Sequence, residues 1–134
     1  MKTVYKRTNT TVSLINYHIV FCPRFRRKIF DIPGVEESFK KHTAEVCREH
    51  DIEILAMECH HDHVYMFVSV YPQLSITDMM KYIKGATSHK LRDEFRQLSQ
   101  MPTLWTRSYF ISTAGNVSAA TIQRYVESQK TRSG

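Results

Sequence analysis

The chain has 134 residues, of which 42% are hydrophobic and 24% are charged, ordinary proportions for a globular protein. This length fits one domain that can bury enough apolar surface to fold without a metal or a disulfide framework. We therefore expect a single domain over residues 1–134. Nineteen Lys and Arg against 13 Asp and Glu give a net charge of +6, an excess that suits a polyanionic partner without proving one.

The lengths of the apolar segments and the spacing of the cysteines indicate where in the cell the protein is found. The longest apolar runs are far shorter than the roughly 18 residues that cross a bilayer, and residues 1–7 lack the apolar region of a signal peptide. Cys22, Cys47 and Cys59 are odd in number and have no C-x-x-C spacing, which favours reduced thiols in a core. We expect a cytoplasmic protein without membrane contact.

The first half of the chain predicts a strand, a helix and a hairpin. Residues 12–22 are rich in β-branched and aromatic types and end at Pro23, as a buried strand does. Apolar residues then recur at helical spacing from Val35 to about His50. Two alternating segments within 52–70, interrupted at 59–62, predict a β-hairpin.

The second half predicts a helix, a strand and a final helix. Ser75 or Thr77 can cap a helix whose apolar stripe continues past Leu91. Residues 102–112 predict the last strand, and a turn at 114–116 leads to a helix that carries a tyrosine. The order β-α-β-β-α-β-α predicts an α+β fold of the ferredoxin-like split β-α-β type, with an antiparallel sheet and helices on one face. The bare face is then free for a ligand or a partner.

One strand of the predicted hairpin presents candidate metal ligands. Residues i and i+2 of a strand point to the same side, so His63 and Tyr65 project together while Val64 and Met66 face the core. Two neutral imidazoles in such a pair can bind a divalent ion and leave positions open for phosphate oxygens. Here a tyrosine occupies the second position. The plain alternative is a polar hairpin with surface histidines.

The final helix presents a candidate nucleophile. Tyr125 and Gln129 are i and i+4, so their side chains share one face, where the amide oxygen of Gln129 could reach a metal beside the phenol. A phenol with an ordinary pKa of about 10 is a poor nucleophile at neutral pH, so a nearby cation would have to assist it. The plain alternative is an aromatic residue that packs a terminal helix.

These motifs and their neighbours resemble the HUH-type single-tyrosine transposases of small insertion sequences, the insertion sequence 200/605 type. The resemblance runs nearly end to end and rests on residues 17–28, 62–64, 82–85, 104–115 and 125–129. It implies that Tyr125 attacks single-stranded DNA, forms a transient 5′-phosphotyrosine link and releases a 3′-hydroxyl. It also implies that His63 is the first histidine of the metal pair and that Gln129 is the third ligand of Mg²⁺ or Mn²⁺.

The resemblance further implies a homodimer whose sheets join, in which the tyrosine helix of one subunit completes the histidine strand of the other. Gly115 lies in the connection between the last predicted strand and that helix, and its backbone freedom suits a hinge. Members of the family bind single-stranded DNA with subterminal hairpins. Basic residues that could neutralise its phosphates are Arg24, Arg26, Arg27, Lys28, Lys81, Lys84, Lys90 and Arg92. The plain alternative is a solvated basic loop and helix face.

Tyr65 departs from the family pattern, because it stands where the second histidine belongs. A neutral phenol is a weak ligand for a hard cation, so metal affinity should fall. His61 and His63 could instead form the metal-binding pair, which would move the metal site about 7 Å along the strand. Alternatively, Cys59, His61 and His63 could bind zinc. Two other functions stay open: a degenerate copy that still binds DNA hairpins, and a ferredoxin-like RNA binder that uses stacking aromatics and no metal.

Overall fold

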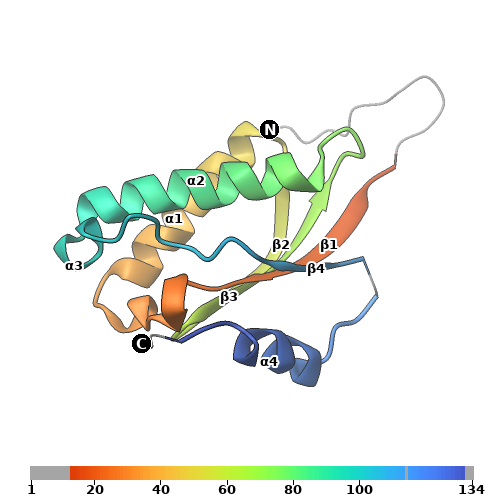
Figure 1. Ribbon diagram of the computed structural model, residues 1–134. Coiled ribbons are helices and arrows are strands. Elements are labelled where there is room, and N and C mark those ends of the chain that lie inside the picture. The colour runs from red at the N-terminus through yellow and green to blue at the C-terminus, as the bar shows by residue number, and fades with distance from the viewer. Residues whose placement is uncertain (1–12, 114, 132–134) are drawn as a thin grey trace.

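The computed structural model describes residues 13–113 and 115–131, which form a four-stranded antiparallel sheet with helices on both faces (Figure 1). The strand order β2-β3-β1-β4 places β1 and β3 in the centre, and this confirms the ferredoxin-like arrangement. The elements in chain order are β1 (Ile15–Phe21), the 3-10 turns η1 (Arg24–Arg26) and η2 (Ile29–Asp31), α1 (Val35–Glu49), β2 (Glu53–His60), β3 (His63–Val70), α2 (Ile76–Glu94), α3 (Arg96–Ser99), β4 (Phe110–Ser112) and α4 (Ala119–Glu127).

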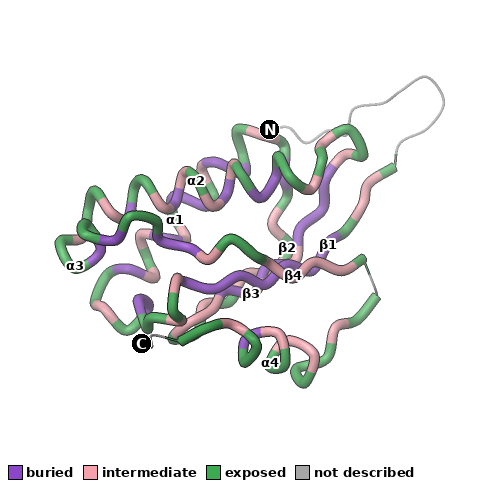
Figure 2. Tube along the Cα trace, in the orientation of Figure 1, coloured by how far each residue is buried: buried purple, intermediate pink, exposed green. Residues whose placement is uncertain are grey.

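The main core lies between the sheet and the pair of helices α1 and α2. Alternate residues of the central strands, such as Ile19 and Phe21 of β1 and Met66 of β3, are fully buried there. Figure 2 shows these central strands as the most continuously buried part of the sheet. The helix α4 lies on the opposite face of the sheet, so the face expected to be bare is partly covered (Figure 1).

The two long helices begin where the sequence predicts. Ser75 caps α2, because its side chain accepts a hydrogen bond of 3.0 Å from the backbone N–H of Asp78. The helix α1 follows Gly34, whose φ of 90° lies in the left-handed region that favours glycine. The predicted apolar stripe of α2 continued past Leu91, whereas the helix ends at Glu94 and the next buried apolar residue, Leu98, belongs to the separate short helix α3.

The last strand is much shorter than predicted. Only Phe110–Ser112 pair with β1, whereas we expected a strand over residues 102–112. Trp105 is buried in the main core, and its indole N–H donates to the hydroxyl of Thr87 at 3.0 Å. Lys84 donates to the carbonyl oxygen of Thr106 at 2.7 Å, so a side chain satisfies a backbone carbonyl that a neighbouring strand would otherwise bind. The apolar residues that suggested a strand are therefore buried by a loop.

The other boundaries differ by a few residues. The first strand begins at Ile15 instead of residue 12, which lies outside the described residues, and the final helix ends at Glu127, before Gln129. Within the part of the chain that the structure describes, no helix is long and apolar enough to span a membrane.

Candidate active site

His63 lies at the start of β3 and is oriented by a carboxylate. Its Nδ1 donates to Asp62 Oδ1 at 3.1 Å, and Asp62 Oδ2 in turn accepts from Arg26 Nε at 3.2 Å. Burial lowers the pKa of His63 below its ordinary value, although the hydrogen bond to Asp62 opposes this. The imidazole is thus neutral at pH 7 with its proton on Nδ1, which leaves the Nε2 lone pair available. Histidines that bind metals commonly have such a carboxylate partner.

Tyr65 points to the same face of the sheet as His63, away from α1 and α2. Its hydroxyl oxygen lies 2.7 Å from Nδ1 of His18, a residue of β1 that is only 6% exposed and whose ring stacks on Phe67 at 4.4 Å. Burial and the nearby carboxylate of Glu58 raise the pKa of Tyr65 above its ordinary value. The phenol therefore stays protonated, and its oxygen already has a partner.

His18 is a site residue that the sequence did not reveal. It sits within a run of apolar residues, where a histidine attracts no attention as a ligand. Only the antiparallel register, in which His18 lies opposite Phe67 and Val20 opposite Tyr65, brings its imidazole beside the phenol. The other ring nitrogen, Nε2, is buried with no hydrogen-bond partner among the described residues.

The two other metal options depend on residues that the structure separates. His61 lies in the turn between β2 and β3, with 72% of its side chain exposed, and it bonds to Asp31 of η2. Cys59 packs against the main core on the helix-covered side, where burial raises the pKa of its thiol to about 12. Among the described residues no group of three His, Cys, Asp or Glu could hold a metal, so the zinc interpretation is wrong.

Tyr125 and Gln129 are joined by the hydroxyl of Ser108. Ser108 Oγ donates to Gln129 Oε1 at 2.9 Å and lies 2.9 Å from the hydroxyl of Tyr125. A serine hydroxyl has one proton, so Tyr125 is the donor in the second hydrogen bond. Burial raises the pKa of Tyr125 above its ordinary value, and Ser108 opposes the rise because its hydroxyl can turn and donate to the phenolate once Tyr125 has lost its proton. Although Gln129 follows the end of α4, its side chain still lies beside that of Tyr125.

Lys84 holds the segment that carries Ser108. Its ammonium group donates to the carbonyl oxygens of Thr106 at 2.7 Å, Arg107 at 3.3 Å and Ser108 at 3.4 Å. Burial lowers the pKa of Lys84 to about 8. Lys84 is therefore part of the scaffold of the site, and this placement argues against its expected contact with DNA.

Some of the other basic side chains are hydrogen-bonded within the protein, and the rest are exposed to solvent. Arg92 donates to the carbonyl oxygens of Met101 at 3.2 Å and Pro102 at 3.1 Å, so it too supports the fold. Arg26 is held by Asp62, and Arg24 donates to Thr103. Those that remain exposed are Arg27, Lys28, Lys81 and Lys90.

The histidine strand and the tyrosine helix share one face of the sheet. Val126 of α4 is buried against Val20 and Cys22 of the β1 segment, and both Tyr65 and Tyr125 pack against this small cluster. No hydrogen bond among the described residues links His63 to Tyr125 or Gln129. A polar face with a carboxylate–histidine pair and a phenol is thus assembled within one chain.

The fold is that of a class of transposases. The family model described as "Transposase IS200 like" matches residues 11–129. The chain belongs to this family and is a transposase.

Curated relatives agree with this assignment. The chain is 30% identical to the ISDra2 transposase TnpA of Deinococcus radiodurans, over 92% of this chain and 90% of that protein. It is 32% identical to the transposase for insertion sequence element IS200 of Salmonella typhimurium, over 84% of this chain and 75% of that protein.

Two solved structures have the same fold. A crystal structure of a Deinococcus radiodurans protein assigned as a transposase superposes with a TM-score of 0.86 and 26% identity, covering 95% of this chain and 99% of that one. A tyrosine transposase associated with REP sequences and bound to a REP hairpin superposes with a TM-score of 0.60 and 12% identity, covering 94% and 69%. The second likeness concerns the fold alone.

Proposed function

We propose that this chain cleaves and rejoins single-stranded DNA through Tyr125. The divalent ion, Mg²⁺ or Mn²⁺, would be held by His63 and Gln129 with Tyr65 as a further ligand, whereas His61, the other ligand expected from the sequence, lies in the turn before β3 and bonds to Asp31. The observation that carries the proposal is the bridge from the Tyr125 hydroxyl through Ser108 to Gln129 Oε1, on the sheet face that also bears His63. Membership of the transposase family supports it.

The proposed reaction exchanges one phosphate ester for another. The phenol oxygen of Tyr125 attacks the phosphorus, the bond from phosphorus to the 3′-oxygen breaks, and that oxygen takes a proton to leave as a 3′-hydroxyl. The phenol proton points at Ser108 before the attack and is lost to solvent as the new ester forms. Because the phosphotyrosine link conserves an ester bond, a 3′-hydroxyl can later attack it and rejoin the strand.

The residues present fit a divalent ion in part. His63 offers a neutral Nε2 and Gln129 a hard amide oxygen, once the hydrogen bond from Ser108 is given up. When bound, the ion would act as a Lewis acid on the phosphate oxygens. Tyr65 shares the face of His63 but offers a protonated phenol tied to His18, and His61 lies outside that face. Affinity for the ion should therefore depend on the DNA phosphate as well as on the protein.

A second function is supported by Tyr65 itself. A chain whose phenol is engaged by His18 could have lost metal-dependent cleavage while it still binds DNA hairpins. The fold neighbour bound to a REP hairpin makes a hairpin the natural DNA partner to test in both cases. We also propose a homodimer joined at a sheet edge, with Gly115 as the hinge that lets α4 dock on either subunit.

A covalent adduct between the protein and DNA distinguishes the two functions. Hairpin-bearing single-stranded DNA, labelled on the strand 3′ of the cleaved bond, is incubated with the protein and Mn²⁺ and resolved under denaturing conditions. We expect an adduct that Tyr125→Phe abolishes. Tyr82→Phe is the matched control and should keep it, because Tyr82 stacks on His50 in the helix layer. Binding of the hairpin without any adduct would contradict the enzymatic function and favour the degenerate copy.

A further inference from the structure

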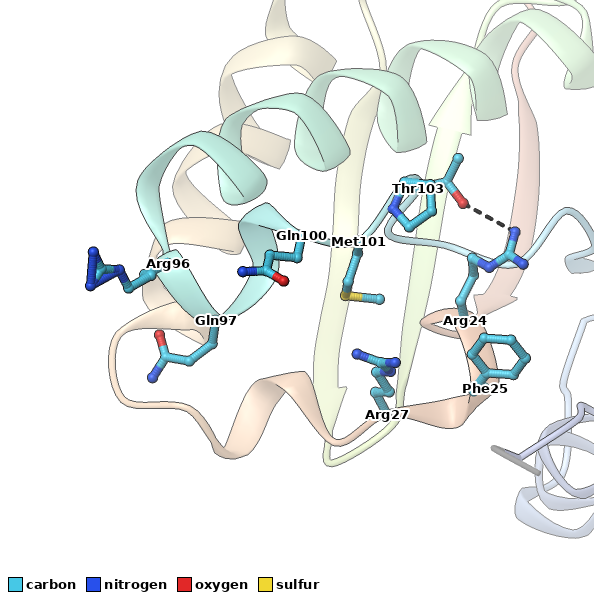
Figure 3. Close-up of a pocket in the computed structure, with 9 residues that line it drawn as sticks. Arg24, Phe25, Arg27, Arg96, Gln97, Gln100, Met101 and Thr103 are labelled. Atoms are coloured by element: carbon cyan, nitrogen blue, oxygen red, sulfur yellow. Dashed lines mark hydrogen bonds between the residues drawn. The ribbon is translucent and has the colours of Figure 1, made fainter. Parts of the chain in front are cut away.

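A pocket of about 370 Å³ opens beside the basic loop after β1, at the side of the sheet where α3 lies (Figure 3). Its size is within the range of small-ligand sites. In Figure 3, Arg27 and Gln100 point into the space, Phe25 closes one side and Arg96 lies at the outer rim. Its lining residues are Arg24, Phe25, Arg27, Arg96, Gln97, Gln100, Met101, Pro102 and Thr103.

The charge of this pocket indicates an anionic ligand. Three arginines and no carboxylate line it. Arg24 donates to Thr103 Oγ1 at 3.3 Å, whereas the guanidinium groups of Arg27 and Arg96 have no ion-pair or hydrogen-bond partner among the described residues. Guanidinium groups left free in this way can form paired hydrogen bonds with a phosphate. The pocket therefore has unused capacity for one.

Its remaining chemistry fits a nucleobase. Phe25 is one of two large exposed hydrophobic residues among those described, with 38% of its surface accessible. An exposed aromatic ring beside a basic groove is a platform on which an unpaired base stacks. The amides of Gln97 and Gln100 each offer a donor and an acceptor, as base edges require.

The backbone of the loop is held in an unusual conformation. Phe25 and Arg26 have φ values of 58° and 51°, in the left-handed region that residues with side chains rarely adopt. Arg26 is anchored to Asp62, the carboxylate that orients His63. The same short segment thus presents Phe25 and Arg27 to the pocket and contacts the histidine strand. Through Arg26 and Asp62, the loop that lines the pocket is therefore linked to His63.

We propose that this pocket binds one unpaired nucleotide of the single-stranded DNA substrate, with its base on Phe25 and its phosphate facing Arg27. The identity of the strand rests on the proposed function, but binding in the pocket does not require cleavage. The pocket fixes the position of the strand relative to His63, and the nucleotide that it holds lies close along the chain to the scissile phosphate.

The test is an abasic scan at equilibrium. Full-length Tyr125→Phe protein is titrated, without metal, against a fluorescent DNA hairpin whose single-stranded flanks lack one base at a time. We expect one flank position at which loss of the base weakens binding about tenfold. Phe25→Ala should weaken binding to intact DNA by a similar factor. In this variant, loss of the base at that position should no longer change the affinity. Phe25→Leu, which keeps apolar bulk in the strained loop, should behave in the same way.

Controls separate the pocket from general effects. Leu55→Ala removes the other large exposed hydrophobic residue and should keep the abasic effect. Arg27→Gln should lower the slope of log affinity against log salt by about one, whereas Arg48→Gln, an exposed arginine of α1, should not. Additive effects of Phe25→Ala and base loss at every position, or no binding of hairpin DNA, would overturn the proposal. If no covalent adduct forms but Phe25→Ala and loss of the base still have non-additive effects on binding, the result would contradict the proposed cleavage and leave the proposed nucleotide pocket in place.

Discussion

The two faces of the sheet are built on different principles, although the same strands make both. Toward α1 and α2, residues such as Ile19, Phe21 and Met66 are fully buried in one large apolar core. Toward α4, the buried apolar set among the described residues is Val20, Cys22 and Val126, against which the half-buried side chains of Tyr65, Phe110, Ile122 and Tyr125 pack. Stability is therefore concentrated on one face, and the groups that can do chemistry lie on the other.

The difference is clearest along β3. Val64, Met66 and Val68 point into the core, whereas His63 and Tyr65 point to the opposite face and find polar partners. Substitutions on the two sides of one strand should thus affect separate properties. The small apolar contact of α4 should also make that helix easier to detach than α1 or α2, as the proposed exchange of α4 between subunits would require.

The largest effect on stability should come from the helix-covered face. Phe39 is fully buried, and its ring contacts those of Phe21, Phe30 and Trp105. Phe39→Ala should lower the free energy of unfolding by about 3–5 kcal/mol, because it leaves a cavity in packed surroundings. Chemical denaturation measures this. Adduct formation per folded molecule should stay unchanged at low temperature, and a stability loss below 1 kcal/mol would contradict the comparison.

The next largest effect should come from His63 and, at pH 7, should concern the chemistry and not the stability. His63→Ala should slow adduct formation at least about 100-fold, equivalent to about 2.7 kcal/mol, because it removes the oriented imidazole. The unfolding midpoint in denaturant should barely change. His60→Ala is the control, since the His60 ring stacks on His63 at 4.6 Å but belongs to β2. Equal losses in both variants would mean that His63 has no special role.

A gain of activity is expected at Tyr65. Tyr65→His restores an imidazole on the face of His63 and removes the phenol that His18 engages, so adduct formation or Mn²⁺ affinity should rise about tenfold. His18→Asn tests the partner separately. An unchanged or lower rate in Tyr65→His would show that the site uses Tyr65 productively.

A smaller effect is expected at Ser108. Ser108→Ala removes the bridge between Tyr125 and Gln129 and should cost about 1 kcal/mol of stability. Ser108 can also donate to the phenolate and so opposes the rise in the pKa of Tyr125, which means that phenolate absorbance should appear at higher pH in the variant. Ser112→Ala, on the same face of the sheet in β4, is the comparison residue. A phenol titration identical to that of the parent would contradict the role of Ser108.

The sequence predicted one face better than the other, for a physical reason. The helices, the hairpin and the alternation of β3 follow from local periodicity, which depends on near neighbours in the chain. The partners His18 and Ser108 do not, because they reach Tyr65 and Tyr125 only through strand register and a loop fixed by Lys84. The same loop explains the shortened β4, since Leu104 and Trp105 are buried there with only an isolated bridge between Trp105 and Pro23 instead of a continuous strand.

The smallest effect should be a pH dependence of stability on the polar face. Burial places the pKa of His63 in the folded chain below its ordinary value of 6.5, so at slightly acid pH the unfolded chain binds the proton more readily. Stability should therefore fall as pH drops below about 6.5. Unfolding midpoints at pH 7, 6 and 5, with a chelator present, should decline more in the parent than in His63→Ala. Parallel declines in the two proteins would assign the pH dependence to residues elsewhere.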